Sequence, residues 1–336
     1  MLKSVIKSQY FQSIARPVIY ITLIGLLGKF VSLARDIKLA SAFGLVGASD
    51  VYFYASTLIF LVAALITQSI NTTVIPILSR AKLKGGVAEK SRLFNNIISF
   101  VMLIGVLTAS TLVLLTFWPL GIKWLTLGFD EEQRRSFVLM IRIGAPSIIL
   151  ISIVAANRNY LQSEARYLET AFSDNILAVL GIFFLFYFAD SWGLTILVVA
   201  IVLAPLLQIA VQYLGFSGLA FRYKPHIDLH DNEIRAMAIL IVPVLISTGI
   251  SDVSKLIDQA LGSTLTVGSL SALAFGGKIS GLVIGICILP LVTVIFPFLS
   301  ASAASSNFDE LRIELRQVAT IVIIITLPVT IAVLVL

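Results

Sequence analysis

Charged residues are scarce in this 336-residue chain, and their scarcity excludes a soluble protein. Asp, Glu, Lys and Arg make up 12% of the sequence, whereas hydrophobic residues make up 58% and the mean hydropathy is +1.02. A soluble domain usually carries about a quarter charged residues. Helices this apolar would have no polar face to turn toward water, so the composition predicts an all-α, polytopic membrane helix bundle.

Cysteine and histidine are almost absent, which removes common ligands of metal sites. The single cysteine, Cys287, can form neither an internal disulfide nor a cysteine cluster, and we interpret it as a packing residue. The two histidines, His226 and His230, lie in a polar stretch where Pro225 and Asp228 favour a loop over a metal site. We therefore expect no metal and no other cofactor.

No motif in the sequence indicates an enzyme. The chain lacks Gly-x-x-x-x-Gly-Lys-Ser/Thr, the phosphate-binding loop of many ATP-hydrolysing proteins. The net charge of +6 could suggest nucleic acid, but many basic residues lie in short loops between apolar segments, where membrane topology explains them. We expect neither catalysis nor a nucleic-acid partner.

Long apolar runs predict about nine membrane-spanning helices, because a helix needs about 20 mainly apolar residues to cross the hydrocarbon layer. The predicted spans cover residues 17–42, 49–79, 91–118, 135–161, 167–189, 193–219, 233–262, 268–302 and 312–336. The last run stays apolar up to Leu336, so we expect the chain to be a fragment, cut at or inside the ninth span.

Basic residues alternate between the two sides of these spans. They gather in the amino-terminal tail and at the junctions after the second, fourth, sixth and eighth spans. The other junctions are almost bare, with Lys123, Arg134 and Arg135 offset by the acidic residues 130–132. Because cytoplasmic loops are enriched in Lys and Arg, the alternation predicts a bacterial inner-membrane protein with a cytoplasmic amino terminus.

A short internal repeat indicates two lobes. The segment Thr72–Ser79 resembles Thr293–Ser300, and in both places a basic segment and another span follow. Chance similarity among apolar helices is the alternative for the short match alone, but the matching topology favours a repeat. We predict an amino-terminal six-helix lobe over residues 1–222 and the first three helices of a second, incomplete lobe over residues 223–336.

Ionisable residues at membrane depth carry most of the functional information, because a charge there is costly unless it faces water, a partner or the bundle interior. The predicted substrate-binding cavity consists of Lys29, Arg35, Asp36, Asp50, Lys255 and Lys278. Lys29 and Asp36 are two turns apart and share a helix face, and Lys255 can pair with acidic neighbours one turn away. A cationic, water-filled cavity suits an anionic cargo, since Arg and Lys commonly bind phosphate.

Other interpretations of these charges stay open. Lys38 and Asp50 lie near helix ends, where snorkelling or capping alone would explain them. An ion or proton relay would instead require unpaired carboxylates or histidines deep in the membrane, and no histidine falls in a predicted span.

Several short motifs follow one another along the chain in a characteristic order. They are Leu33–Asp36, Ala42–Gly44 with Asp50, Asn71–Pro76, Pro146–Ser152, Tyr160–Gln162, Gly268–Ser271, Gly277–Lys278 and Phe296–Ser300. Their order and spacing resemble the MurJ (MviN) family of lipid II flippases over the whole chain. No single motif is decisive, but together they are fairly specific.

The resemblance implies the fold of the multidrug/oligosaccharidyl-lipid/polysaccharide exporters, with two six-helix lobes around a central cavity. It also implies a lipid-linked glycan as the cargo, namely the undecaprenyl-pyrophosphate-linked peptidoglycan precursor lipid II. Alternating access would move this cargo outward without ATP, while membrane lipids surround its tail. In the family's cavity, the cationic positions correspond here to Lys29, Arg35 and Lys278, and the acidic partners to Asp36 and Asp50.

The chain departs from the family pattern in its second helix and at cavity positions. Lys29 and Lys278 stand where the family usually has Arg, and Gln68 stands where it usually has Glu. Ile59-Phe60 and Ala63-Ala64 replace a Pro-Asn pair and a basic pair. Lysine lacks the two-pronged fork that arginine offers to pyrophosphate. Two alternatives therefore stay open beside lipid II: a flippase for another polyprenyl-linked oligosaccharide (an O-antigen or exopolysaccharide unit), and a non-transporting membrane scaffold in envelope synthesis.

Overall fold

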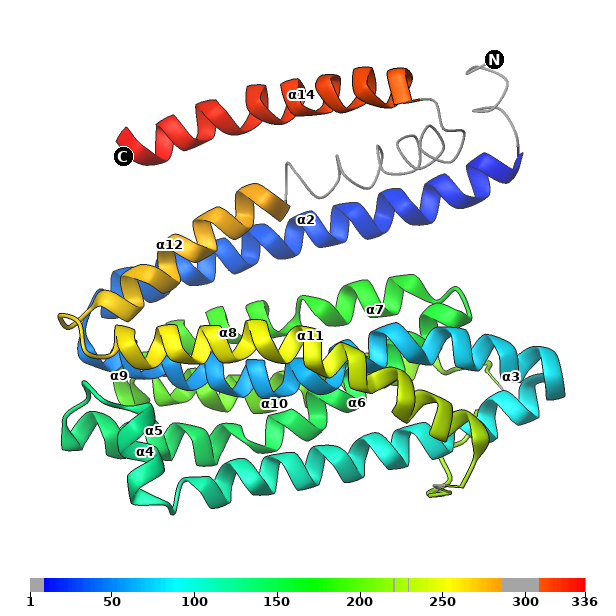
Figure 1. The fold of residues 1–336 in the computed structure, drawn as a ribbon, viewed down its shortest axis with the longest axis horizontal. Helices are drawn as coiled ribbons and strands as arrows, with labels where there is room; N and C mark the ends of the chain where they lie inside the picture. Colours follow the sequence, from blue (N-terminus) through cyan, green and yellow to red (C-terminus); the bar gives the residue numbers. More distant parts are fainter. Residues whose placement is uncertain (1–8, 220, 229, 286–307, 336) are drawn as a thin grey trace. The chain divides into compact units, whose positions relative to one another are not determined.

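The computed structural model describes residues 9–219, 221–228, 230–285 and 308–335, and every regular element in these ranges is a helix (Figure 1). The helices are α2 (Gln9–Phe43), α3 (Gly47–Leu115), α4 (Pro119–Leu125), α5 (Glu131–Gly144), α6 (Pro146–Ser163), α7 (Tyr167–Asp174), α8 (Ile176–Tyr187), α9 (Ala189–Trp192), α10 (Thr195–Gly215), α11 (Asn232–Gly262), α12 (Ser269–Val283) and α14 (Phe308–Val335). The predicted all-α class is confirmed for the described residues.

The chain forms two compact units. The first unit, Met1–Ser271, holds α2 through α11 and the first residues of α12, and the second unit, Ala272–Leu336, holds the rest of α12 and α14. The division of the chain into lobes after residue 222 stays a prediction.

Helix α3 contains a reversal that turns one long helix into two arms. Gly85 and Gly86 leave the helical conformation, and Gly86 has φ +68°, a value that residues with a side chain rarely adopt. The first arm (residues 47–84) and the second arm (residues 87–115) therefore run in opposite directions (Figure 1). They correspond to the predicted second and third spans.

Apolar helical stretches in the described residues are long enough to cross a membrane. They are Gly47–Leu115, Glu131–Ser163, Tyr167–Tyr187 and Thr195–Gly215. Because α3 holds two arms, these stretches account for the predicted second to sixth spans. Helices α2, α11 and α14 overlap the first, seventh and ninth, and α12 covers the start of the eighth, whose remainder lies outside the described residues.

The fourth and fifth spans are less regular than the sequence predicts. The fourth is divided between α5 and α6 at Ala145, before Pro146, whose missing N–H suits the start of a helix. The fifth is divided between α7 and α8 at Asn175, whose side-chain amide donates to the backbone carbonyl of Ala171 at 3.1 Å. Asparagine side chains compete for backbone hydrogen bonds in this way and so disfavour a continuous helix.

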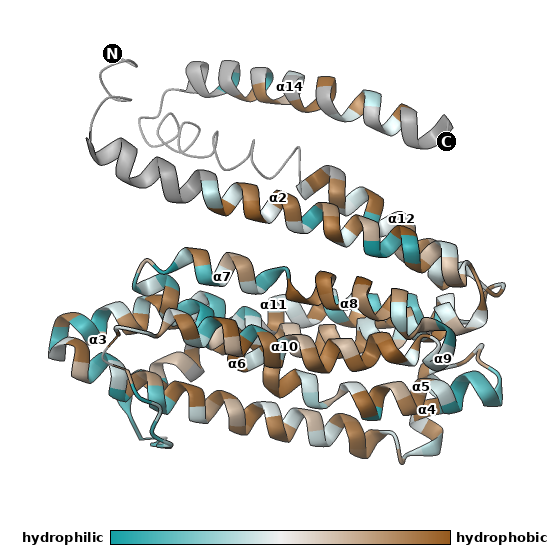
Figure 2. Cartoon of the chain, turned by 180° about the vertical axis from the view of Figure 1, so that it is seen from behind, coloured by the Kyte–Doolittle hydropathy of each residue, from teal (hydrophilic) through white to brown (hydrophobic). Residues whose placement is uncertain are grey.

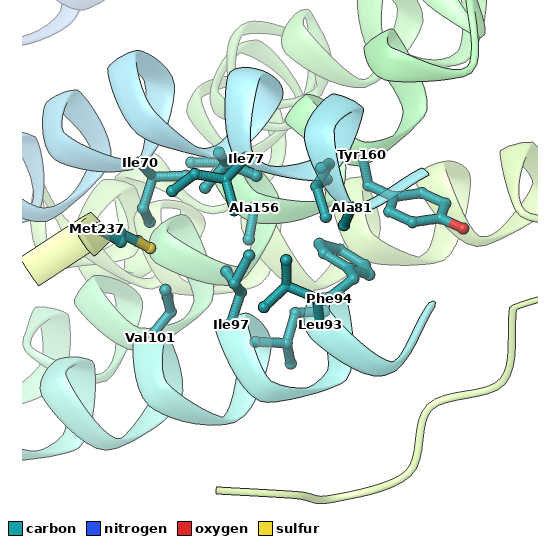
Figure 3. Close-up of a cluster of buried hydrophobic side chains, with 14 of the residues drawn as sticks. Ile70, Ile77, Ala81, Leu93, Phe94, Ile97, Val101, Ala156, Tyr160 and Met237 are labelled. Atoms are coloured by element: carbon teal, nitrogen blue, oxygen red, sulfur yellow. The ribbon is translucent and has the colours of Figure 1, made fainter. Parts of the chain in front are cut away.

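The main hydrophobic cluster joins both arms of α3 to α6 and α11 (Figure 3). In its aromatic part, Phe94 stacks on Tyr160 with ring centroids 4.3 Å apart, and Tyr160 stacks on Phe216 at 5.4 Å. Met237 brings α11 into the same cluster. Because lipid is as apolar as these side chains, such contacts hold the helices together through close packing and not through escape from water.

Polar residues concentrate at the two ends of the first unit (Figure 2). One end holds the turn of α3 and the polar loop between α10 and α11, and we call it the basic end because of Lys82, Lys84, Lys90, Arg92, Arg166, Arg222, Lys224 and Arg235. The opposite end holds α4, the start of α5, α9 and the segment between α11 and α12. This polarity fits a bundle whose two ends reach water on either side of a membrane.

The loop predicted around the two histidines is confirmed. Residues 221–228 form no helix, and α11 begins at Asn232. Thr72–Ser79 lies in the first arm of α3, while its predicted repeat Thr293–Ser300 and the single cysteine, Cys287, lie outside the described residues.

Candidate functional site

The predicted charged residues of α2 include an ion pair. Both Nε and Nη2 of Arg35 donate to Oδ1 of Asp36, at 3.1 and 2.8 Å. The two side chains are only 21% and 14% exposed. Asp36, an acidic partner that the family resemblance implies, thus pairs with Arg35, and one positive charge of this helix is balanced locally.

Two glycines allow α2 to pack closely on α7 and α8. A Cβ atom at Gly28 would overlap the carboxamide of Asn175, and this carboxamide donates to the backbone of α2 at 3.2 Å. Two turns further along α2, the aliphatic part of Arg35 crosses Gly181 of α8, where a Cβ atom would collide with it. The sequence thus positions Arg35 by leaving room for it on the neighbouring helix.

Lys29 follows Gly28 and Asp36 follows Arg35, so both residues lie on the face of α2 next to the packed one. Both residues are partly exposed. In the described part of the chain, no carboxylate lies within ion-pair distance of the Lys29 ammonium. Because the charges of Arg35 and Asp36 cancel, the Lys29 ammonium leaves this part of α2 with one net positive charge.

Asp50 connects the start of α3 to the start of α12. Its residue is 5% exposed, and its carboxylate accepts hydrogen bonds from the backbone N–H of Gly268 at 2.6 Å and of Ser271 at 2.7 Å, and from the Ser271 hydroxyl at 2.5 Å. The first N–H groups of a helix have no partner within it, and their partial positive charge favours an anion. Asp50 therefore caps α12 from a position 218 residues before Gly268.

Capping is one of the roles that the sequence leaves open for Asp50. The structure identifies the capped helix as α12 and not α3, whose own N-cap residue is Val46. In this arrangement the carboxylate is closed off by α12, so its role as an acidic partner in a cargo cavity stays a prediction.

The predicted pairing along α11 is present. Nζ of Lys255 donates to Oδ1 of Asp252 at 2.9 Å. The Asp252 side chain is 9% exposed and that of Lys255 is 62% exposed, so the ammonium lies at the surface of the unit.

Lys278 belongs to the second unit. Its ammonium lies over the ring of Phe275, 5.5 Å from the centroid. Phe275 is in the same unit, and the two units are described separately. A chamber shared by Lys29, Arg35 and Lys278 therefore stays a prediction.

Sequence analysis missed the ion pairs that join different elements. Arg158 of α6 pairs with Asp174 at the end of α7. At the basic end, Lys90 is 1% exposed and pairs with Glu164, which also accepts from Lys82 at 2.9 Å. The charges themselves are visible in the sequence, but their partners lie on other elements and no local spacing reveals them.

At the basic end, Glu164 and Asp231 have pKa values below the ordinary carboxyl range. Burial by itself raises the pKa of Glu164, but the ammonium groups of Lys90 and Lys82 outweigh it and lower the pKa. Burial likewise raises the pKa of Asp231. Hydrogen bonds from the Arg92 guanidinium and from backbone N–H groups lower this pKa by more, so the net shift is downward. Both groups are therefore held in the charged form.

Three buried side chains of α3 fasten the loop before α11. The amide of Asn95 donates to Arg222 O at 3.2 Å and accepts from Lys224 N at 2.9 Å. The Asn96 amide donates to Asp228 O and accepts from Asp228 N, both at 2.9 Å. The Ser99 hydroxyl accepts from the backbone N–H of His226, between these two contacts, at 3.2 Å. The loop is thus fixed to α3 up to the residues just before α11.

Apolar helices with charges held inside the bundle define a polytopic α-helical membrane protein. A comparison with known families assigns it more closely: the family described as lipid II flippase MurJ matches residues 39–336. The chain belongs to this family, which confirms the resemblance seen in the sequence motifs.

Curated relatives carry the same description. The chain is 24% identical over 311 residues to a probable lipid II flippase MurJ of Rhizobium tropici, covering 89% of this chain and 57% of that protein. It is 22% identical to the protein of the same description from Vibrio cholerae, covering 87% of this chain and 57% of the relative. The chain therefore spans a little over half the length of these relatives.

Solved structures confirm the exporter fold. A structure described as lipid II flippase MurJ in an inward closed conformation matches 92% of this chain and 64% of its own length, with a TM-score of 0.74 and 19% identity. A MOP superfamily transporter from Pyrococcus furiosus matches 93% of this chain and 69% of its own, with a TM-score of 0.56 and 15% identity.

Proposed function

We propose that this chain belongs to a flippase that carries a polyprenyl-pyrophosphate-linked peptidoglycan precursor, lipid II, across the bacterial cytoplasmic membrane by alternating access. The family supports this cargo, because the relatives are described as probable lipid II flippases. The basic end faces the cytoplasm, since Lys and Arg accumulate on that side of membrane proteins, and the amino terminus then lies there too.

The observation that carries the proposal is the buried contact between Asp50 and the start of α12. A protein that works by alternating access needs a contact that closes one side and can be broken to open it. Asp50 joins two helix ends at the opposite end of the bundle, so this contact closes the extracytoplasmic side. The cargo then enters from the basic end.

Positive side chains receive the pyrophosphate in this proposal. Lys29 keeps an unbalanced charge on α2, and Arg35 lies further along the same helix, held by Asp36. Lys278 completes the set from the second unit. Neutralising the head group lowers the cost of moving two negative charges through a medium of low dielectric constant, while the polyprenyl tail stays in lipid.

The test replaces Lys29, Arg35 and Lys278 by Ala, singly and together, in the full-length protein. We measure flipping and cell survival after depletion of the native flippase, and expect loss of both in the triple variant. Lys38→Ala is the matched control, because it removes the same charge from the same helix, where Lys38 lies over the ring of Phe186. Unchanged rates in all the cavity variants would overturn the cationic mechanism, and survival without flipping would favour a scaffold.

A flippase for another polyprenyl-linked oligosaccharide is the second candidate. The lysines at positions 29 and 278 favour it, because a lysine ammonium binds phosphate as a point charge and not in the bidentate manner of arginine. Complementation of cells depleted of their lipid II flippase separates the two. Growth supports lipid II as the cargo, and failure of a well-expressed full-length protein supports the other glycan.

A further inference from the structure

A pocket of about 460 Å³ lies between α4 and α5 at the opposite end of the bundle. Its lining contains the basic residues Lys123, Arg134, Arg135 and Arg142 and a single acidic residue, Glu131. The enrichment of basic residues on the cytoplasmic side does not explain this cluster, because the basic end of the bundle is the other one.

Asp130 and Glu131, two acidic residues near the pocket, are already used. The Asp130 carboxylate accepts from the backbone N–H of Gln133 at 2.8 Å and caps α5. Glu131 pairs with Arg134, which also donates to the backbone carbonyl of Phe129 at 2.9 Å. Arg134 is thereby a structural residue, and the positive charge of the pocket comes from the others.

Arg142 is the most informative of these residues. It lies two helical turns beyond Arg135, about 10 Å along the axis, within the predicted fourth span, residues 135–161. Its Nε donates to Thr116 Oγ1 at 2.9 Å, and its guanidinium lies 4.1 Å from the ring centroid of Phe117.

These contacts orient the guanidinium but leave most of its N–H donors without a protein acceptor in the described part of the chain. No carboxylate there pairs with Arg142, Arg135 or Lys123. A guanidinium without a carboxylate partner in a predicted membrane span is costly, so a bound anion is the expected partner.

The surroundings of the pocket indicate the kind of anion. Trp118, Leu120 and Trp124 on and beside α4 are 56%, 63% and 72% exposed. Exposed tryptophans beside basic residues are typical of the boundary between lipid head groups and hydrocarbon. Val138 and Leu139 line the pocket between Arg135 and Arg142 and offer an apolar wall for an acyl chain.

We propose that this pocket binds the head group of an anionic phospholipid. The phosphate accepts hydrogen bonds from Arg142 and attracts Arg135 and Lys123, while the acyl chains lie along the exposed apolar side chains of α4 and α5. The bound lipid anchors the α4–α5 corner, which also contacts the start of α3 through the hydrogen bond from Tyr54 to Leu125 O at 2.7 Å.

The test titrates the purified full-length protein in detergent with phosphatidylglycerol and, in parallel, with zwitterionic phosphatidylcholine, and counts bound lipids by native mass spectrometry. We expect one phosphatidylglycerol site that phosphatidylcholine does not fill. Arg142→Gln and Arg135→Gln should each weaken that site by about tenfold, as expected for the loss of a charge-assisted hydrogen bond. Arg80→Gln removes an exposed arginine at the basic end and should leave the site unchanged.

Two results would overturn the proposal: equal binding of the two lipids, or phosphatidylglycerol binding that both α5 variants leave intact. Arg135 is exposed and has no ion-pair partner in the described residues, so its variant tests the site even where loss of Arg142 impairs folding. A protein that binds phosphatidylglycerol normally but does not flip its cargo would contradict the transport function alone. A protein that flips its cargo but lacks the phosphatidylglycerol site would contradict the lipid-binding proposal alone.

Discussion

Single buried charges hold the contacts at the two ends of the first unit. At the opposite end Asp50 accepts three hydrogen bonds from the start of α12. At the basic end Lys90 is almost fully buried against Glu164. A hydrogen bond to a charged group contributes about 1.5–3 kcal/mol, so each of these residues controls a contact that a neutral replacement would weaken.

The Asp50 contact should open when its charge is removed. In a background with Cys287→Ser, Ser49→Cys serves as a reporter, because Ser49 is 1% exposed next to Asp50. Adding Asp50→Asn should raise the labelling rate of this cysteine by an impermeant thiol reagent, since a carboxamide binds the α12 N–H groups more weakly. Asp190→Asn, an exposed acid at the same end, is the control. Equal labelling in both variants would argue against a gate at this position.

The Glu164 contact should make stability depend on pH in acid. Because the pKa of Glu164 is lowered in the folded protein, its contribution is present above the ordinary carboxyl pKa of about 4.3 and is lost as the pH falls through the folded value. We expect the Tm of the purified protein in detergent to fall below about pH 5. Glu164→Gln should lower stability at pH 7 by about 3 kcal/mol, because Lys90 stays buried without its partner, and should reduce the acid dependence. An exposed acid, Glu132, provides the control variant Glu132→Gln.

At the scale of elements, small residues decide which helices can approach. Helix α2 lies on α7 and α8 where Gly28 meets Asn175 and where Gly181 makes room for Arg35. Such contacts are typical of membrane bundles, because close packing and not hydrophobicity drives helix association in lipid.

Two glycines on one face of α2 allow a matched test of this packing. Gly28→Ala should lower the Tm, because its methyl group would displace the Asn175 carboxamide from the α2 backbone. Gly25→Ala meets open space one turn earlier and should be neutral or stabilising by up to about 1 kcal/mol, through helix propensity. Thermal unfolding in detergent compares the two, and an equal effect would show that α2 does not depend on this contact.

At the scale of the whole molecule, the two polar ends and the apolar middle of the first unit indicate how that unit lies in the membrane. The proposed orientation is tested with Lys84→Cys and Lys123→Cys, each in the Cys287→Ser background. An impermeant thiol reagent added to intact spheroplasts should label the variant at position 123 and not the one at 84, because the basic end faces the cytoplasm. The opposite pattern would invert the orientation and, with it, the direction of access.

Most of the fold could be predicted from the sequence, and much less of the candidate site. The second to sixth spans match helices because hydropathy adds up along a continuous segment. The divisions at Ala145 and Asn175 were not predicted, although Pro146 and Asn175 are the residues that produce them. In the site, the Arg35–Asp36 and Asp252–Lys255 pairs were accessible because both partners lie on one helix.

The sequence by itself determined the membrane class, the second to sixth helical spans, the alternation of charge and the family of this protein. Each of these follows from residues that are neighbours in the chain or from the order of short motifs. Only the tertiary structure decided that Asp50 caps α12, that Glu164 neutralises the buried Lys90, and that Arg142 reaches Thr116. These partners are far apart in the sequence. The residues next to a charged residue do not reveal its partner, because the packing of the helices decides which groups meet.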